Sequence, residues 1–334
     1  MSCRLVRVVQ WLLLVLPWLV PSGAQGGQPA VTLQAAYSSI SGSQAVLWLA
    51  RDAGLLEKHG VRADVVFISS GSKLTLALMA GDVTVAQVGG AAVVSATLGG
   101  ADLVLIASNL NTVPTSLMAA PSIKKVEELR GKAVGVSRFG SNLDVAARLA
   151  LRRFGLEPDR DVAMLQLGGV QEILAALRTG RVPAGSLSYP DIAQARKLGF
   201  QELVDVSALG IEFPYTALAA RRSFVRDREE VAYRFVKGYS EAISAFKTNR
   251  ELSMRVIGRY SRISDTEVLG QTVDFYAPRM ASVPYPTAGG VRFILEQLAL
   301  RNPRARSADP QQFLELRLVK RLEEEGFFRR LPGR

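Results

Sequence analysis

The sequence has one cysteine and one histidine among its 334 residues. The cysteine, Cys3, lies in an N-terminal segment that we expect to be removed, so the remaining chain can form no disulfide. Structural and catalytic zinc sites need three or four convergent ligands, and no group of Asp and Glu residues has the spacing of a calcium loop. We therefore expect no metal site.

Signatures of serine hydrolases and nucleotide-binding enzymes are also scarce. There is no Gly-x-Ser-x-Gly elbow, and a catalytic triad would depend on His59 alone, which lies in a polar turn typical of a solvated surface. The glycines at 140 and at 168–169 lack the spacing of a nucleotide fingerprint. The sequence therefore predicts neither an enzyme nor a bound cofactor.

No stretch of the chain combines a run of basic residues with interleaved aromatics. The formal net charge is +11, but lysines and arginines occur singly or in pairs, usually near acids. Nucleic-acid binding requires a focused basic stripe, so we expect no nucleic-acid partner. The distribution instead indicates a solvated surface with a mild preference for anionic partners.

The N-terminus carries the features of a secretory signal. Arg4 and Arg7 precede an apolar run from Val8 to Val20, and small flexible residues follow it as far as Ala24. A membrane-spanning helix needs about 20 apolar residues, and this run is shorter and contains Pro17, so a retained anchor is the weaker alternative. We expect residues 1–24 to be a signal peptide cleaved near Ala24, which leaves a charge of +9 once its two arginines are lost from the +11.

Two segments, 33–92 and 133–191, have the same order of predicted strands, loops and helices, about one hundred residues apart. Each starts with a strand, a serine- and glycine-rich loop and a helix that ends at a glycine, which tolerates a positive φ. A second strand and helix and a third strand follow. The first copy predicts strands ending at Tyr37, at 65–68 and at 83–88, with helices at 44–53 and 73–80. The second predicts strands at 133–136, 162–167 and 182–187, with helices at 142–154 and 170–178.

Strands that alternate with helices in this way form parallel sheets covered by helices on both faces. We therefore predict an α/β fold with two lobes, each a mostly parallel sheet flanked by helices, joined by two hinge crossings at 110–120 and 210–218. Lobe 1 is predicted to comprise residues 30–112 and 217–330, and lobe 2 residues 113–216. Helices are predicted in the C-terminal part at 228–247, 250–260, 264–276, 288–300 and 310–325.

The loops that follow the predicted strands combine hydroxyl groups, glycines and helix N-termini. Ligands bind at the carboxyl ends of strands in open parallel sheets, and helix N-termini bind anionic groups. The alternative is that these turns only cap helices. The candidate ligand-binding residues are Ser39, Ser41, Ser70, Gly71, Ser72, Gly89, Gly90, Ala91, Arg138, Phe139, Gly140, Ser141, Ser188, Tyr189 and Tyr215. We expect them to hold a small ligand with an anionic or strongly accepting end.

Several segments of this sequence, taken in order, resemble the solute-binding proteins of importers for nitrate, sulfonates, taurine and related compounds. The segments that carry the resemblance are 53–61, 70–72, 80–83, 126–136, 140–141, 154–156, 221–225 and 322–327. The resemblance implies a type II periplasmic binding protein fold, a periplasmic location, and a membrane permease with its ATPase subunit as partners. It does not identify the ligand, and Ser188-Tyr189-Pro190 departs from the aromatic-acid-proline pattern of many sulfonate-type relatives. We expect a monomer.

Two alternatives remain at this stage. One is a ligand-binding sensor or accessory protein without a role in transport, which neighbouring genes for a permease and an ATPase would argue against. The other is an enzyme of thiamine-pyrimidine synthesis, which has the same fold. Such an enzyme relies on a site histidine and a cysteine-rich motif, neither of which this sequence offers.

Overall fold

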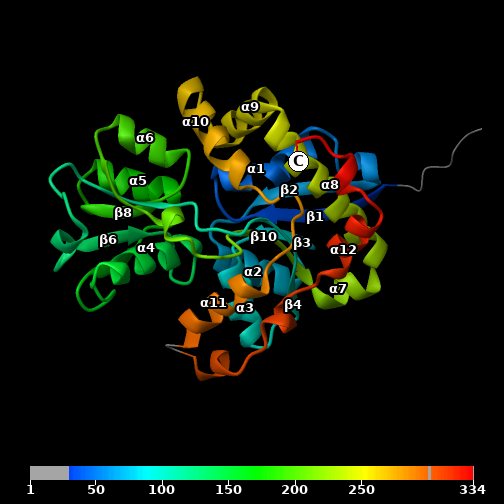
Figure 1. Cartoon of the computed structure of the whole chain (residues 1–334), viewed down its shortest axis with the longest axis horizontal. Coiled ribbons are helices and arrows are strands. Elements are labelled where there is room, and N and C mark those ends of the chain that lie inside the picture. Colours follow the sequence, from blue (N-terminus) through cyan, green and yellow to red (C-terminus); the bar gives the residue numbers. More distant parts are fainter. Residues whose placement is uncertain (1–29, 300–301, 334) are drawn as a thin grey trace, which may run out of the picture.

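The computed structural model describes residues 30–299 and 302–333 and shows two lobes, each built around a five-stranded sheet (Figure 1). The predicted α/β two-lobed fold is confirmed. The predicted signal peptide, residues 1–24, lies outside the described residues. Within the described ranges, no helix is both long and apolar enough to span a membrane.

Lobe 1 contains the sheet with strand order β2-β1-β3-β10-β4. All its strands are parallel except β10, which is antiparallel to β3 and to β4. The strands are β1 Val31–Tyr37, β2 Val61–Phe67, β3 Val85–Val88, β4 Leu103–Leu110 and β10 Thr216–Arg221. Every residue of β3 and β4 is buried, as expected for strands that have helices on both faces.

Lobe 2 repeats this arrangement with strand order β7-β6-β8-β5-β9. Its antiparallel strand is β5, which pairs with β8 and β9. The strands are β5 Ser116–Ala119, β6 Ala133–Val136, β7 Ala163–Gln166, β8 Ala184–Leu187 and β9 Gln201–Asp205. The order β2-β1-β3 in one lobe therefore corresponds to β7-β6-β8 in the other, as the duplication in the sequence predicts.

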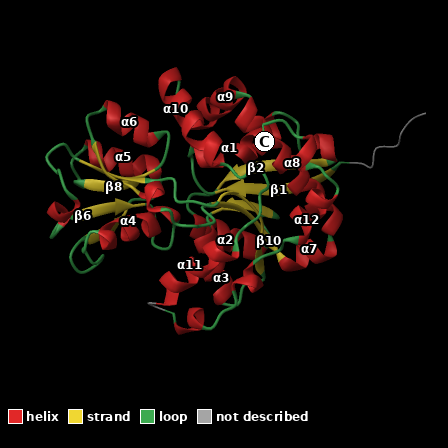
Figure 2. Cartoon of the chain, in the orientation of Figure 1, coloured by secondary structure: helices red, strands yellow, loops and turns green. Residues whose placement is uncertain are grey.

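Helices cover both faces of each sheet, and the C-terminal helices belong to lobe 1 (Figure 2). In lobe 2, α5 and α6 lie on one side of the sheet and α4 on the other. Helix α10 of lobe 1 reaches across to contact α6 of lobe 2. The helices are α1 Ala45–Asp52, α2 Gly71–Ala80, α3 Gly90–Leu98, α4 Asn142–Arg153, α5 Val170–Arg178, α6 Asp191–Lys197, α7 Arg222–Asp227, α8 Glu229–Thr248, α9 Arg250–Ser261, α10 Thr266–Tyr276, α11 Ala288–Ala299 and α12 Arg317–Glu324.

The chain passes from the lobe 1 sheet to the lobe 2 sheet between β4 and β5 and returns between β9 and β10. The first crossing is thus shorter than the predicted segment 110–120, because β5 lies inside that segment and pairs within lobe 2. Each crossing is followed directly by the antiparallel strand of the sheet that it enters. The direction of β5 and β10 is therefore a consequence of where the chain enters each lobe.

One predicted helix, 310–325, is wrong in its first half. Residues Pro310–Phe313 form a single 3-10 turn behind Asp309, and the α-helix α12 starts only at Arg317. Between them the backbone N–H of Glu315 donates to Leu105 O at 2.8 Å, and Leu314 forms an isolated bridge with Leu105 of β4. The segment therefore extends the edge of the sheet and cannot continue as a helix.

Candidate ligand-binding site

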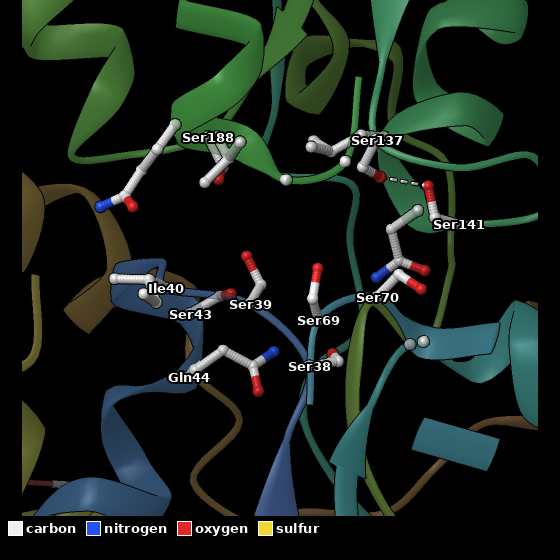
Figure 3. A pocket seen from close by; sticks show the side chains of 18 of the residues that line it. Ser38, Ser39, Ile40, Ser43, Gln44, Ser69, Ser70, Ser137, Ser141 and Ser188 are labelled. Atoms are coloured by element: carbon white, nitrogen blue, oxygen red, sulfur yellow. Dashed lines mark hydrogen bonds between the residues drawn. The ribbon is translucent and has the colours of Figure 1, made fainter. Parts of the chain in front are cut away.

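A cavity of about 90 Å³ lies between the lobes, at the ends of strands from both sheets (Figure 3). Ser39 and Ser69 point into it from lobe 1, and Ser137 and Ser188 face them from lobe 2. Both lobes therefore contribute polar groups to one cavity, which has room for several water molecules or a small organic solute.

The N-cap residues of five described helices line this cavity. They are Gln44 of α1, Ser70 of α2, Gly89 of α3, Ser141 of α4 and Gly169 of α5. The first N–H groups of a helix have no partner inside that helix, and the helix dipole makes this end electropositive. Helix α1 continues directly from a 3-10 turn, where Ala45 N–H donates to Gly42 O, and Gly90 N–H of α3 donates to Pro214 O. The N-termini of α2, α4 and α5 are therefore the ends that favour a solute with a hydrogen-bond-accepting group.

Ser70 has an unusual backbone conformation at the start of α2. Its φ of 74° and ψ of 146° lie in a region that is essentially restricted to glycine. Its N–H donates to Ser38 O at 3.0 Å, and its carbonyl accepts from Leu74 N at 3.1 Å. The residue is 6% exposed and its Oγ makes no hydrogen bond within the chain. A residue with a strained backbone and a buried, unpartnered hydroxyl therefore lies at the wall of the cavity.

Ser70 and Lys73 have the Ser-x-x-Lys spacing of some serine hydrolases. The side chain of Lys73 is exposed and does not line the cavity. Because the Ser70 hydroxyl makes no hydrogen bond, Lys73 is not placed to activate it as a base. The pair therefore does not form a nucleophile with its general base.

Asn142, the first residue of α4, connects lobe 2 to the second crossing. Its side-chain Nδ2 donates to the carbonyl oxygen of Tyr215. Its Oδ1 is buried and has no hydrogen-bond partner within the chain. A Cβ placed on Gly89 would lie 2.2 Å from this oxygen, so only glycine allows lobe 1 to approach Asn142 so closely.

The charge of the cavity differs from what the sequence predicts. Among the described residues that line it, there is no Lys, Arg or His, and the one ionisable acid is Glu172 in the first turn of α5. Glu172 is exposed and lies against Gly169, where an added Cβ would be 2.6 Å from its Oε2. Arg138, which was predicted among the ligand-binding residues, does not line the cavity, and no carboxylate was predicted there.

A second acid, Asp191, lies just behind the cavity at the start of α6 but does not line it. Burial, with a smaller contribution from Glu172, raises the pKa of Asp191 to about 7. No His, Cys, Asp or Glu residues in the described ranges gather in a group of three or more that could hold a metal ion.

A cluster of buried hydrogen bonds joins the two lobes beside the cavity. The carbonyl oxygen of Tyr189, in lobe 2, accepts from Gly42 N at 3.0 Å and from Ser41 Oγ at 3.0 Å, both in lobe 1. Ser188 Oγ donates to Ser41 Oγ at 3.0 Å, and Tyr276 OH lies 3.2 Å from that same oxygen. The Tyr189 ring also stacks on Phe275 of α10 at a centroid distance of 4.5 Å. These contacts hold the lobes together in this conformation.

The structure places seven of the predicted ligand-binding residues at the cavity wall. These are Ser39, Ser70, Gly71, Gly89, Ser141, Ser188 and Tyr215. The others do not line it: Ser41, Ser72, Gly90, Ala91, Arg138, Phe139, Gly140 and Tyr189.

Some residues outside the wall have other partners. Ser41 and Tyr189 join the lobes, as described above. The N–H of Gly90 donates to Pro214 O at 2.9 Å, the N–H of Phe139 to Gln166 Oε1 at 2.9 Å, and the N–H of Gly140 to Asp144 Oδ2 at 2.9 Å. Backbone donors that are already engaged in this way are not free for a ligand in this conformation.

Other residues that line the cavity were not predicted from the sequence. They include Ser38, Ile40, Ser43, Gln44, Phe67, Ser69, Ser137, Asn142, Gly168, Gly169 and Glu172. Gly169 could have been found, because it occupies in the second copy of the duplication the position that Ser70 occupies in the first. Asn142 and Glu172 carry no such signal, since each lies in the first turn of its helix and could equally face solvent.

The chain matches the model of the NMT1-like family over residues 26–258. A curated relative from Brucella abortus, named "Putative binding protein", is 27% identical over 221 residues, which cover 64% of this chain and 67% of the relative.

Two solved structures illustrate the likeness in fold. The alkanesulfonate-binding protein SsuA of Xanthomonas axonopodis pv. citri, bound to MOPS, gives a TM-score of 0.72 at 18% identity and covers 85% of this chain and 96% of its own. The periplasmic nitrate-binding protein NrtA of Synechocystis PCC 6803 gives 0.74 at 13% identity and covers 89% of each chain. At such low identities the likeness establishes the fold.

Proposed function

This chain belongs to the NMT1-like family, and from that membership and the cavity between its lobes we propose that it is an exported solute-binding protein. It captures a small polar solute between the lobes and delivers it to an ATP-driven importer in the membrane. The N-terminal leader, residues 1–24, directs it to the periplasm and is then removed.

The observation that carries this proposal is the convergence of helix N-termini from both lobes on one cavity. The N-caps of α1, α2 and α3 approach it from lobe 1, and those of α4 and α5 approach it from lobe 2. No Ser, His and acid are arranged there as a triad, since His59 forms its hydrogen bond with Glu241 in lobe 1. The arrangement binds a polar group and offers no means of transforming it.

The names of proteins with the same fold support solute capture but leave the solute open. SsuA is named for alkanesulfonates and NrtA for nitrate, and the Brucella relative is named only as a binding protein. Import is favoured over sensing by a further protein of this fold, from Staphylococcus aureus, which is described as the ligand-binding component of an ABC-type import system.

We propose that the lobes close on the solute by bending at the two crossings, 111–115 and 206–215. Closure forms direct contacts between the lobes, including the ion pairs of Lys197 of α6 with Asp265 and with Glu267 at 2.7 Å each. A solute that contacts both lobes adds to these contacts and shifts the equilibrium toward the closed form.

A thermal-shift screen of small solutes on the purified protein tests the binding function. A solute present at 100 times its Kd stabilises the folded state by about 2.7 kcal/mol, which is readily detected. The hits are then titrated by calorimetry into Ser39→Glu, which places a bulky carboxylate in the cavity, and into Ser307→Glu, which places it on an exposed residue outside the cavity.

We expect Ser39→Glu to lose binding and Ser307→Glu to keep it. Small-angle scattering should show that the parent protein becomes more compact with a saturating hit. Absence of any hit from a broad screen, or equal binding by both variants, would refute capture in this cavity. Uptake of a radiolabelled hit by cells with and without the protein then separates import from sensing.

A further inference from the structure

The side-chain amide of Gln44, the N-cap residue of α1, has its orientation set by residues behind the cavity. Gln44 is 3% exposed and lines the cavity. Its Oε1 accepts from Gln87 Nε2 at 3.0 Å. Because an amide nitrogen can only donate, the atom of Gln44 that faces Gln87 is its oxygen, and its nitrogen lies on the other side of the amide. Figure 3 shows this nitrogen turned toward the cavity and the oxygen turned toward the interior of lobe 1.

A buried network in lobe 1 holds Gln87 in the orientation that this contact requires. Gln87 Nε2 also donates to the backbone carbonyl of Gln44 at 2.8 Å, and a carbonyl can only accept. The hydroxyl of Tyr239, on α8, lies 2.7 Å from Gln87 Oε1 and 3.0 Å from Asn109 Oδ1. Asn109 Nδ2 in turn donates to Ser43 O at 3.4 Å. Reversing the Gln44 amide would therefore bring two donor nitrogens face to face.

The nitrogen of the Gln44 amide has no protein partner. Nε2 makes no hydrogen bond with the described residues, and it is not one of their fully covered, unpartnered atoms, so it keeps accessible surface at the cavity wall. No cationic side chain lies among the described residues of that wall, so neutral donors have to bind the solute. A donor that is fixed in place before the solute arrives loses little freedom on binding.

We propose that Gln44 recognises the solute: its Nε2 donates to an oxygen that can only accept, such as a carbonyl or sulfonyl oxygen, and Gln87, Asn109 and Tyr239 are positioning residues. This inference rests on the proposed function and assigns one residue to the accepting group of the solute. A solute that presents an N–H group at this position is rejected, because two donors would then face each other.

Methanesulfonate and dimethyl sulfone are the probes that test the proposal by calorimetry. They are nearly isosteric, and both present sulfonyl oxygens and no hydrogen-bond donor. One is an anion and the other is neutral, so their comparison shows whether the oxygen is recognised with or without a charge. We expect at least one of them to bind the parent protein.

Two substitutions of Gln44 separate the loss of a donor from a change of shape. Gln44→Met keeps the length of the side chain and should weaken binding about tenfold, the value of one hydrogen bond. Gln44→Glu keeps the shape and the acceptor toward Gln87. At about pH 8 its carboxylate should weaken binding more than Gln44→Met does. At about pH 5 the buried carboxyl is protonated and can donate again, so its affinity should rise above that of Gln44→Met.

Gln171 offers a matched control for the added charge. It lies in the first turn of α5, is exposed, and lines the same cavity. Gln171→Glu should weaken dimethyl sulfone threefold or less, whereas Gln44→Glu should weaken it at least tenfold at about pH 8. Glu172 at the wall and Asp191 behind it are present in every variant, so each affinity is compared with that of the parent at the same pH.

Tyr239→Phe tests the positioning role in a double-mutant cycle. The substitution removes the hydrogen bond to Gln87 Oε1 and allows both glutamine amides to reorient. We expect the affinity to fall severalfold when Gln44 is present. In the Gln44→Met background there is no amide to orient, and the same substitution should leave the affinity unchanged. An equal loss in both backgrounds would refute positioning.

The outcomes separate this proposal from the one on which it rests. The donor proposal is wrong, and solute capture stands, if Gln44→Met binds as tightly as the parent or if Gln171→Glu and Gln44→Glu weaken dimethyl sulfone equally. The same holds if Gln44→Glu folds and shows no recovery at low pH, or if neither probe binds while the screen finds another solute. If Gln44→Glu does not fold, Gln44→Met and the Tyr239 cycle decide. If no solute binds at all, both proposals fail.

Discussion

Replacing Ser70 by glycine should stabilise the empty protein and weaken solute binding. The backbone of Ser70, at φ 74° and ψ 146°, lies where a non-glycine residue costs about 1–3 kcal/mol. Its hydroxyl, buried without a partner, costs about 1–3 kcal/mol more in lost hydration. The greater freedom of glycine in the unfolded chain offsets roughly 0.5–1 kcal/mol of this gain. We therefore expect the free energy of unfolding to rise by at least about 1 kcal/mol, or roughly 2 °C in Tm.

Urea unfolding of the solute-free protein, followed by circular dichroism, measures the change against two further variants. Ser70→Ala removes the hydroxyl but keeps the strained backbone, so its gain in stability should be smaller. Ser69→Gly is the matched control, because Ser69 lines the same cavity but does not have a positive φ. It should lose about 0.5–1 kcal/mol.

The order of stabilities decides whether the reasoning holds. A lower urea midpoint for Ser70→Gly than for the parent would refute the strain argument and would mean that the hydroxyl has a native partner. The affinity of Ser70→Gly for any solute found in the screen should fall, in contrast to its stability. The loss of one hydrogen bond of roughly 1.4 kcal/mol lowers the affinity about tenfold. A gain in stability with unchanged affinity would place the solute away from α2.

Tyr276→Phe removes the hydroxyl that contacts Ser41 at the lobe junction. Small-angle scattering should then show a more open solute-free protein, and the free energy of unfolding should fall by about 1 kcal/mol. Because burial raises the pKa of Asp191 to about 7, the folded state holds a proton that the unfolded chain releases near pH 4. Stability should thus fall as the pH rises from about 4 to 7, and Asp191→Asn should flatten this profile in urea titrations. Arg148→Met removes the ion pair of Arg148 with buried Asp144 at 2.7 Å, so that Asp144 keeps the N–H of Gly140 as a hydrogen-bond donor, and it also removes the pair of Arg148 with Asp159. This change should cost about 3–5 kcal/mol, measured by calorimetric melting.

The helices and parallel strands were predictable because their signals are local. The predicted bounds of β6, 133–136, and of α5, 170–178, match the structure. Glycines with a positive φ follow several of these helices, for example Gly81 after α2 and Gly155 shortly after α4. A glycine there permits the left-handed turn that ends a helix, and it can be recognised without knowledge of the rest of the fold.

The strand β5 and the start of α12 were not predictable in the same way. The four residues of β5, Ser116–Ala119, are too few for an alternating pattern and form a strand only because β8 and β9 pair with both of its edges. The residues before α12 pair with the edge strand β4 through the hydrogen bond from Glu315 N to Leu105 O. Pairing partners so distant in the sequence leave no local trace.

The candidate site shows the same difference between local sequence signals and contacts that join distant segments. Ser141 was predictable because it directly precedes the predicted helix 142–154, and its side chain caps α4 there. The contacts of Ser41 with Tyr189 and of Asn142 with Tyr215 depend on how one lobe meets the other. The sequence therefore indicated which loops gather at the cavity but could not distinguish residues that face a solute from residues that join the lobes.

The duplicated architecture suggests where the specificity of this cavity arises. Both copies supply helix N-termini, so the positive ends of α2 and α5 are common to the two lobes and cannot favour one orientation of a solute. The copies differ at equivalent positions. Ser70 precedes α2 where Gly169 precedes α5, and the third residue of α2 is Lys73 where that of α5 is Glu172. Lys73 is exposed and does not line the cavity, whereas Glu172 does. The two ends of the cavity are thus unlike, with a hydroxyl at one and a carboxylate at the other. A solute with two unlike ends would be oriented by that difference.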